Sequence, residues 1–125
     1  MHYSAWQHTA LAVTRIGFSA LLMTHGYAKL VRLLSGEFQF ANPLGIGELP
    51  TLILAVLAEF VAPVFIILGI KTRWASLLPM ATMLVAALVV HWADPFNRKE
   101  HALLFFLGFL VVYVFGAGKY SLGKN

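Results

Sequence analysis

The chain has 125 residues, of which 60% are hydrophobic and 11% charged, with 9 Lys and Arg, 5 Asp and Glu, and no Cys. Soluble domains are roughly 45–50% apolar and about 25% charged, so a water-soluble domain of this length is excluded. The basic residues stand singly or in pairs at the ends of apolar runs, which argues against a nucleic-acid-binding stripe, and the lack of cysteine excludes disulfides, thiolate metal ligands and a cysteine nucleophile.

Charged residues and turn formers divide the sequence into four apolar stretches, each near the roughly 20 residues that cross a bilayer core. These stretches predict membrane-spanning helices at about residues 9–30, 52–70, 74–92 and 100–117. The first stretch keeps Arg15 within it and lacks both a basic start and an A-x-A cleavage site, so we expect it to remain as an anchor. Pro63 and Pro79 lie inside the second and third stretches and predict kinks without breaks.

The lengths of the connections predict how these helices are arranged. The segment 31–51 is long and rich in Gly, Pro and Asn, which predicts an irregular or partly re-entrant loop. The link 71–73 is only a tight turn, so the second and third helices should pack as an antiparallel hairpin, with both termini on one side. The compact Lys-Thr-Arg turn favours cytoplasmic termini. We therefore predict an all-α fold, an integral membrane four-helix transmembrane bundle that forms a single domain over residues 1–125.

Polar residues inside the apolar stretches are the candidates for chemistry, because no phosphate loop, dinucleotide-binding glycine pattern or nucleophile elbow is present. Glu59 is the clearest of them. By the helical rise it lies about 10 Å below one surface, where a carboxylate is costly unless it has a partner or faces a cavity. Because successive helices alternate in direction, the same half of the membrane receives five more polar residues: His25, Lys29, His91, Glu100 and His101.

Several of these residues also have a structural interpretation. Glu59 could be a structural carboxylate that pairs with Arg15, which shares an expected inward-facing stripe of the first helix with His25 and Lys29. Lys29 could instead be a flank residue whose long stem reaches the membrane surface. Imidazoles near the surface could serve only to bind headgroups, backbone carbonyls or water: His25, His91 and His101.

Motifs of fairly specific spacing run through nearly the whole chain. They are His25-Gly26 followed by Lys29, Glu59 with Pro63 and Leu68-Gly69, Thr72-Arg73, His91, Glu100 before Leu103, and the run from Gly116 to Leu122. This pattern resembles the DoxX family of small four-helix membrane proteins. The resemblance implies a multi-pass protein of the bacterial inner membrane. Some members of the family are linked to thiosulfate:quinone oxidoreductase or to the membrane subunit of a terminal quinol oxidase, and others to redox homeostasis with partner proteins.

Two classes of function are open. In the first, the chain is a membrane subunit of a quinone-linked redox system, because carboxylates and imidazoles can hydrogen-bond quinone carbonyls and carry protons. The catalytic candidates are then Glu59, His25, His91 and Glu100, and the candidate contacts to the quinone are His25, Lys29, Glu59 and His91. In the second, the chain is a non-catalytic scaffold or accessory subunit. Transport of a small solute is a further alternative.

The expected partners and cofactors follow from the same residues. A haem or metal site is disfavoured, because no H-x-x-x-H or E-x-x-H spacing occurs on one helix. The cofactor is left open, with a quinone as one candidate. We expect the chain to lie in a lipid bilayer and to contact a partner protein or a second copy of itself, and we expect no nucleic acid.

Overall fold

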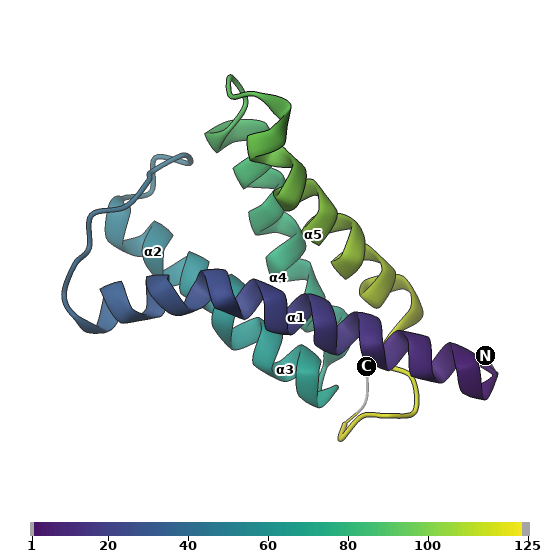
Figure 1. Cartoon of the computed structure of the whole chain (residues 1–125). Coiled ribbons are helices and arrows are strands. Elements are labelled where there is room, and N and C mark those ends of the chain that lie inside the picture. The colour runs from purple at the N-terminus through teal and green to yellow at the C-terminus, as the bar shows by residue number, and fades with distance from the viewer. Residues whose placement is uncertain (1, 124–125) are drawn as a thin grey trace.

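The computed structural model describes residues 2–123, which form helices and loops and contain no strand (Figure 1). The helices are α1 (Ala5–Leu34), α2 (Glu48–Val56), η1 (Leu57–Val61), α3 (Ala62–Leu68), α4 (Thr72–Val85), η2 (Ala86–Val90) and α5 (Phe96–Phe115), of which η1 and η2 are π-helical turns. The segments α2, η1 and α3 form one continuous run, Glu48–Leu68, and α4 with η2 forms another, Thr72–Val90. The predicted all-α class is confirmed.

The first two helical runs differ from the predicted helices at their ends. The helix α1 extends beyond residues 9–30 at both ends, and a capping box at Ser4 fixes its start: the Ser4 hydroxyl accepts from the Gln7 amide, and the Gln7 side chain accepts from the Ser4 amide. The second run begins at Glu48, so Glu59 lies about 16 Å along the helix axis from its start. The carboxylate of Glu59 is therefore near the middle of this run, deeper than the sequence indicated.

Two of the described runs, Glu48–Leu68 and Thr72–Val90, are long and apolar enough to cross a membrane. Both runs continue through their proline. Large apolar side chains remain exposed on all four helical runs, for example Leu21, Val61, Leu88 and Val114. Such a surface suits contact with lipid chains, which are as apolar as leucine.

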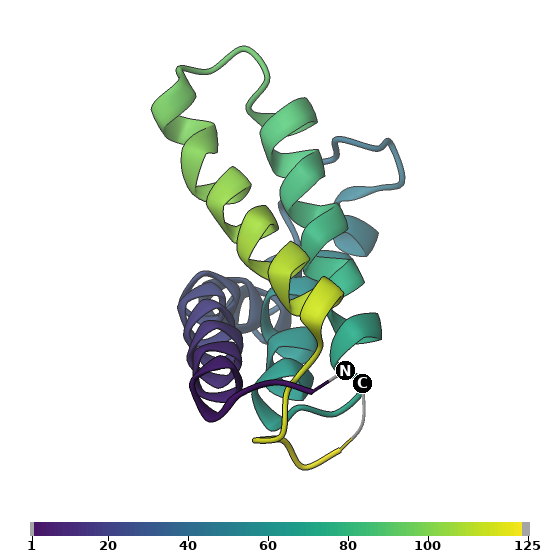
Figure 2. The ribbon, with the colours of Figure 1, turned by 90° about the vertical axis from the view of Figure 1, so that its right-hand side faces the viewer.

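The helices pack as two pairs that diverge toward one end of the molecule (Figure 1). The helix α1 lies along α2, η1 and α3, and α4 lies along α5; the pairs meet where α3 contacts α4 and where α1 crosses α5. Figure 2, in which α1 is seen nearly end-on, shows this crossing. The predicted hairpin of the second and third helices is thus correct only next to its turn. Farther from the turn, α2 packs against α1 and leaves α4.

The segment that follows α5 folds back and is held by Arg15. The guanidinium of Arg15 is buried and donates hydrogen bonds to the backbone carbonyls of Ala117, at 2.8 Å, and Tyr120. Farther along, the Leu122 amide donates to the Leu68 carbonyl at 2.8 Å. The predicted alternative of an Arg15–Glu59 pair is therefore wrong, because the two terminal nitrogens of the guanidinium donate to backbone carbonyls and Glu59 pairs with Lys29.

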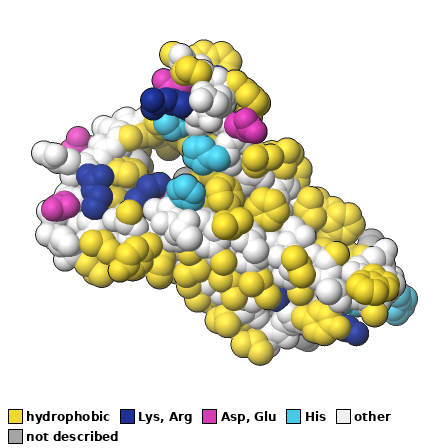
Figure 3. Space-filling model, in the orientation of Figure 1, with side chains coloured by type: hydrophobic (Ala, Val, Ile, Leu, Met, Phe, Trp, Pro, Cys, Tyr) yellow, Lys and Arg dark blue, Asp and Glu magenta, His cyan; other side chains and the backbone are white. Residues whose placement is uncertain are grey.

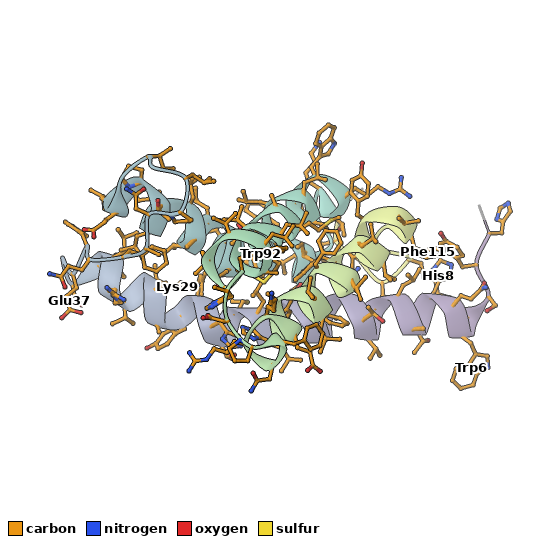
Figure 4. The ribbon with its side chains drawn as sticks, turned by 90° about the horizontal axis from the view of Figure 1, so that it is seen from above. Trp6, His8, Lys29, Glu37, Trp92 and Phe115 are labelled. Atoms are coloured by element: carbon orange, nitrogen blue, oxygen red, sulfur yellow. The ribbon has the colours of Figure 1, made fainter. Side chains whose placement is uncertain are left out.

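Contacts at the start of α1 bring the two ends of the described chain together. The Lys119 amide donates to Nδ1 of His8 at 3.0 Å, and the Tyr3 hydroxyl donates to the Phe115 carbonyl at 3.3 Å. Figure 4 shows His8 beside Phe115 at one end of α1 and Lys29 toward the other end. The connections 35–47 and 91–95 lie at the opposite, open end of the molecule (Figure 1).

Candidate functional site

An ion pair between α1 and η1 lies at the centre of the candidate site. The Glu59 carboxylate pairs with the Lys29 ammonium, and their side chains are 3% and 28% exposed. Lys29 is therefore not merely a flank residue that extends toward the membrane surface; it is the partner that a carboxylate at this depth requires. The Glu59 side chain is directed inward, as predicted.

A glycine allows the two helices to approach closely enough for this pair. A Cβ atom added at Gly26 would lie 2.3 Å from the backbone oxygen of Glu59 and 2.9 Å from its Cβ. The α1 backbone at Gly26 thus rests directly on η1. Pro63 contributes to the local geometry of η1, because it has no N–H to offer to the Glu59 carbonyl one turn earlier. Isolated π-helical turns of this kind are frequent at functional sites.

A cavity of about 490 Å³ opens beside the ion pair, between the two diverging helix pairs. This volume lies within the range of roughly 300–1,000 Å³ typical of small-molecule sites. Most of its wall is apolar, and Figure 3 shows the hollow with basic and histidine side chains around its rim. Five ionisable side chains line the cavity: His25, Lys29, Glu59, His91 and His101.

Two histidines stack across the cavity from different helices. The rings of His25 on α1 and His101 on α5 are 5.8 Å apart and inclined by only 19°. The edge of Phe105 packs against His25, with ring centroids 5.8 Å apart and planes at 84°. These contacts link α1 to α5 at the open end of the molecule.

The third histidine is oriented by a carboxylate. Nδ1 of His91, which follows η2, lies 2.7 Å from the Asp94 carboxylate. An ionised carboxylate only accepts hydrogen bonds, so Nδ1 carries a proton and Nε2 of the neutral ring is an acceptor. The tautomer of His91 is thus set by its neighbour in the loop.

The loop 35–47 forms one wall of the cavity. The sequence predicted an irregular loop here but did not predict its contact with the site. The ring of Phe40 lies 5.7 Å from the Lys29 ammonium and 5.9 Å from the Arg32 guanidinium. Arg32 also donates to the backbone carbonyl of Gln39. Cation–π contacts and this hydrogen bond therefore hold the loop against the end of α1. The loop residues on the cavity wall are Phe40, Ala41, Pro43, Leu44 and Ile46.

The structure brings four of the five predicted site residues to one cavity: His25, Lys29, Glu59 and His91. The predicted catalytic candidate Glu100 is not among the residues of the wall. Glu100 is exposed. It directly precedes His101 on α5, so its side chain points about 100° around the helix from that of His101, which lines the cavity. His101, which the sequence left open as a solvated residue, is exposed and also lines the cavity.

Two contributors to the site were missed from the sequence. Gly26 had a usable signal, because small residues mark close helix contacts in membranes and this one follows His25 directly. Phe40 had none, because it lies in an irregular loop without periodicity. Among residues 2–123, no group of three or more His, Asp or Glu side chains is placed to hold a metal ion.

The sequence is similar to those of known proteins. The family model described as DoxX matches residues 10–92. A protein of Haemophilus influenzae, described only as an uncharacterized protein, is 32% identical over 124 residues, covering 92% of this chain and 89% of the relative. No solved structure matches the chain.

Proposed function

The chain belongs to the DoxX family of membrane proteins, and on that premise we propose that it is the membrane subunit of a quinone-linked redox system. One observation carries the proposal: a cavity of about 490 Å³ places an ion pair and three imidazoles against apolar walls. A quinone combines polar and apolar parts in the same way, because it has two carbonyl oxygens on a ring that is otherwise apolar.

The side chains of the cavity suit the proton steps of quinone reduction. Conversion of a quinone to a quinol takes two electrons and two protons, one proton for each carbonyl oxygen. The Lys29 ammonium and the N–H groups of His25 and His101 are hydrogen-bond donors for those oxygens, and Glu59 can accept and release a proton beside them. Nε2 of His91 is instead an acceptor for the hydroxyl of the quinol. The His91–Asp94 pair extends from the cavity into the loop and offers a route for protons to the surface. We assign the electrons to a reduced partner protein.

We also propose that all four helical runs cross the bacterial inner membrane, with both termini in the cytoplasm. Exposed tryptophans support this topology, because membrane proteins concentrate them at the two interfaces. Trp6 and Trp74 lie in the first turns of α1 and α4, and Trp92 lies at the opposite end, just after η2. The cavity then opens in the periplasmic half of the membrane.

Cysteine labelling tests this topology in a chain that has no cysteine of its own. Glu37 and Arg73 are exposed and lie in or next to connections at opposite ends of the molecule. In intact cells, a membrane-impermeant maleimide should label Glu37→Cys, whereas Arg73→Cys should react only after the membrane is opened. Labelling of both variants from the same side would contradict the four-helix topology.

A single substitution tests the proposed chemistry. Glu59→Gln keeps the shape of the side chain but cannot carry the proton, so quinone turnover with the native partner should fall by about 100-fold. Quinone binding should change by no more than about threefold, since the amide still hydrogen-bonds. The matched control is Glu37→Gln, an exposed carboxylate outside the cavity wall, which should be fully active.

The same preparation separates the proposal from its alternative. Full turnover by Glu59→Gln would remove Glu59 from the chemistry. If the wild-type protein binds no quinone and purifies with lipid alone, the chain is a scaffold or accessory subunit.

A further inference from the structure

The helices α2 and α4 do not pack against each other, and a cleft between them extends from the cavity. Four residues of α4 line the cavity and follow one another at spacings of three, one and three positions. This spacing places them in a single stripe on one face of the helix, about 10 Å long. It consists of Leu78, Ala81, Thr82 and Val85. From the other side, α2 contributes Thr51, Leu54 and Ala55. The stripes are apolar except for their two threonines.

An apolar stripe of this length normally packs against another helix. Here α4 packs against α5, α3 and η1, while α2 packs against α1 and η1 (Figure 1). Leu54 is 42% exposed and Ala81 is also exposed, although both line the cavity. The cavity therefore reaches the outer surface of the molecule between α2 and α4.

The depth of this opening determines what it faces. Ala81 lies at the midpoint of the helical run Thr72–Val90, one of the two runs able to cross a membrane. The middle of such a run lies in the hydrocarbon core of the bilayer, where lipid chains and not water surround the protein. An opening at this level admits apolar chains from the side.

We infer that the α2–α4 cleft is a lateral portal that holds the hydrocarbon tail of an amphiphilic ligand, whose headgroup lies beside the Lys29–Glu59 pair. The inference rests on the proposed function and specifies its substrate class: a long-chain quinone dissolved in the membrane, not a short water-soluble one. The ionisable residues and the apolar stripes belong to one continuous cavity, so the two parts of such a ligand can be bound together.

Narrowing the cleft tests the inference with two probes. One is a benzoquinone that carries a decyl chain, and the other is the same benzoquinone with a methyl group in place of that chain. Ala81→Trp fills the cleft from α4, and Leu54→Trp fills it from α2 as a second variant in case the first folds poorly. The matched control is Ala20→Trp, an exposed alanine of α1 that is not on the cavity wall.

Equilibrium binding to the full chain in lipid nanodiscs gives the first readout. Each cleft variant should bind the decyl probe about tenfold more weakly than wild type and the methyl probe within about twofold, because only the tail meets the new indole. Partition of the decyl chain into lipid does not affect this comparison, since it is equal for every variant. Ala20→Trp should behave as wild type. Weakening of both probes alike, or of neither, would overturn the portal and leave the quinone site in place.

Mass spectrometry of the purified protein gives a second readout that does not depend on the headgroup. Wild type and Ala20→Trp should retain a long-chain amphiphile that both cleft variants lack. If neither benzoquinone binds to wild type but this difference is found, the portal stands and the quinone proposal fails. If neither probe binds and no variant differs in the retained amphiphile, both fail.

Discussion

Replacing Gly26 with alanine is expected to lower the free energy of unfolding by about 3 kcal/mol, because the added methyl group has no room. Its Cβ would lie 2.3 Å from the backbone oxygen of Glu59 and 2.5 Å from the carbonyl carbon. These are backbone atoms of η1, so the contact cannot be relieved by turning a side chain. The helix α1 must move away from η1, and Lys29, three residues later on the same face, must move with it.

The matched control for this change is Gly17→Ala on the same helix. A Cβ at Gly17 would meet nothing within 4 Å, and alanine is favoured over glycine in a helix by about 1 kcal/mol. Thermal unfolding in detergent should therefore show a strong loss of stability for Gly26→Ala and none for Gly17→Ala. Equal stability of the two variants would contradict the close contact between α1 and η1.

Replacing Lys29 with methionine is expected to have a comparable effect. It leaves the Glu59 carboxylate, only 3% exposed, without its cation, and breaking a buried pair in this way typically costs about 3–5 kcal/mol. Glu59→Gln should cost less. The glutamine oxygen can still accept a hydrogen bond from the Lys29 ammonium, whose side chain is 28% exposed and so partly hydrated.

A double-mutant cycle identifies the partner of Glu59. Lys29→Met combined with Glu59→Gln should recover most of the stability lost in Lys29→Met, because no unpaired carboxylate remains. Arg15→Gln should not rescue either variant, since Arg15 binds the carbonyls of Ala117 and Tyr120. The thermal stability of the single and double variants in detergent shows whether Lys29 or Arg15 pairs with Glu59. If Arg15→Gln restored the stability of a Glu59→Gln variant and Lys29→Met did not, the Lys29–Glu59 assignment would be contradicted.

Hydropathy and turn residues were sufficient to predict four helical segments, because apolar runs bounded by charges and glycines have few other solutions in lipid. Alternation of helix direction was also sufficient to predict that His25, Lys29, Glu59 and His91 gather in one part of the protein, and all four line one cavity. Neither argument uses contacts between side chains. The first depends on the lengths and boundaries of the apolar runs, and the second on the order of the helices and the helical rise.

The partner of Glu59 could not be predicted in this way. The helical rise measures only depth along one helix. By depth Arg15 came within reach of Glu59, and Lys29 was assigned only to the same half of the membrane. Two features decided between them. Gly26 brings α1 onto η1 one turn before Lys29, and the segment after α5 folds back to occupy Arg15.

The apolar cleft was equally beyond prediction, because a tight turn at residues 71–73 indicates that the adjoining helices are antiparallel but not how far along them they stay in contact. Here α3 and α4 pack beside the turn, and α2 then follows α1. The cavity lies where that contact ends.

A structure of the protein determined in a lipid bilayer with the decyl benzoquinone most directly tests the claim that a quinone headgroup binds beside the Lys29–Glu59 pair. We expect ring-shaped density between Glu59, His25 and His91, with the ammonium of Lys29 on the carboxylate. Lipid chains filling the whole cavity in place of a ring, or a quinone bound elsewhere on the molecule, would contradict the claim.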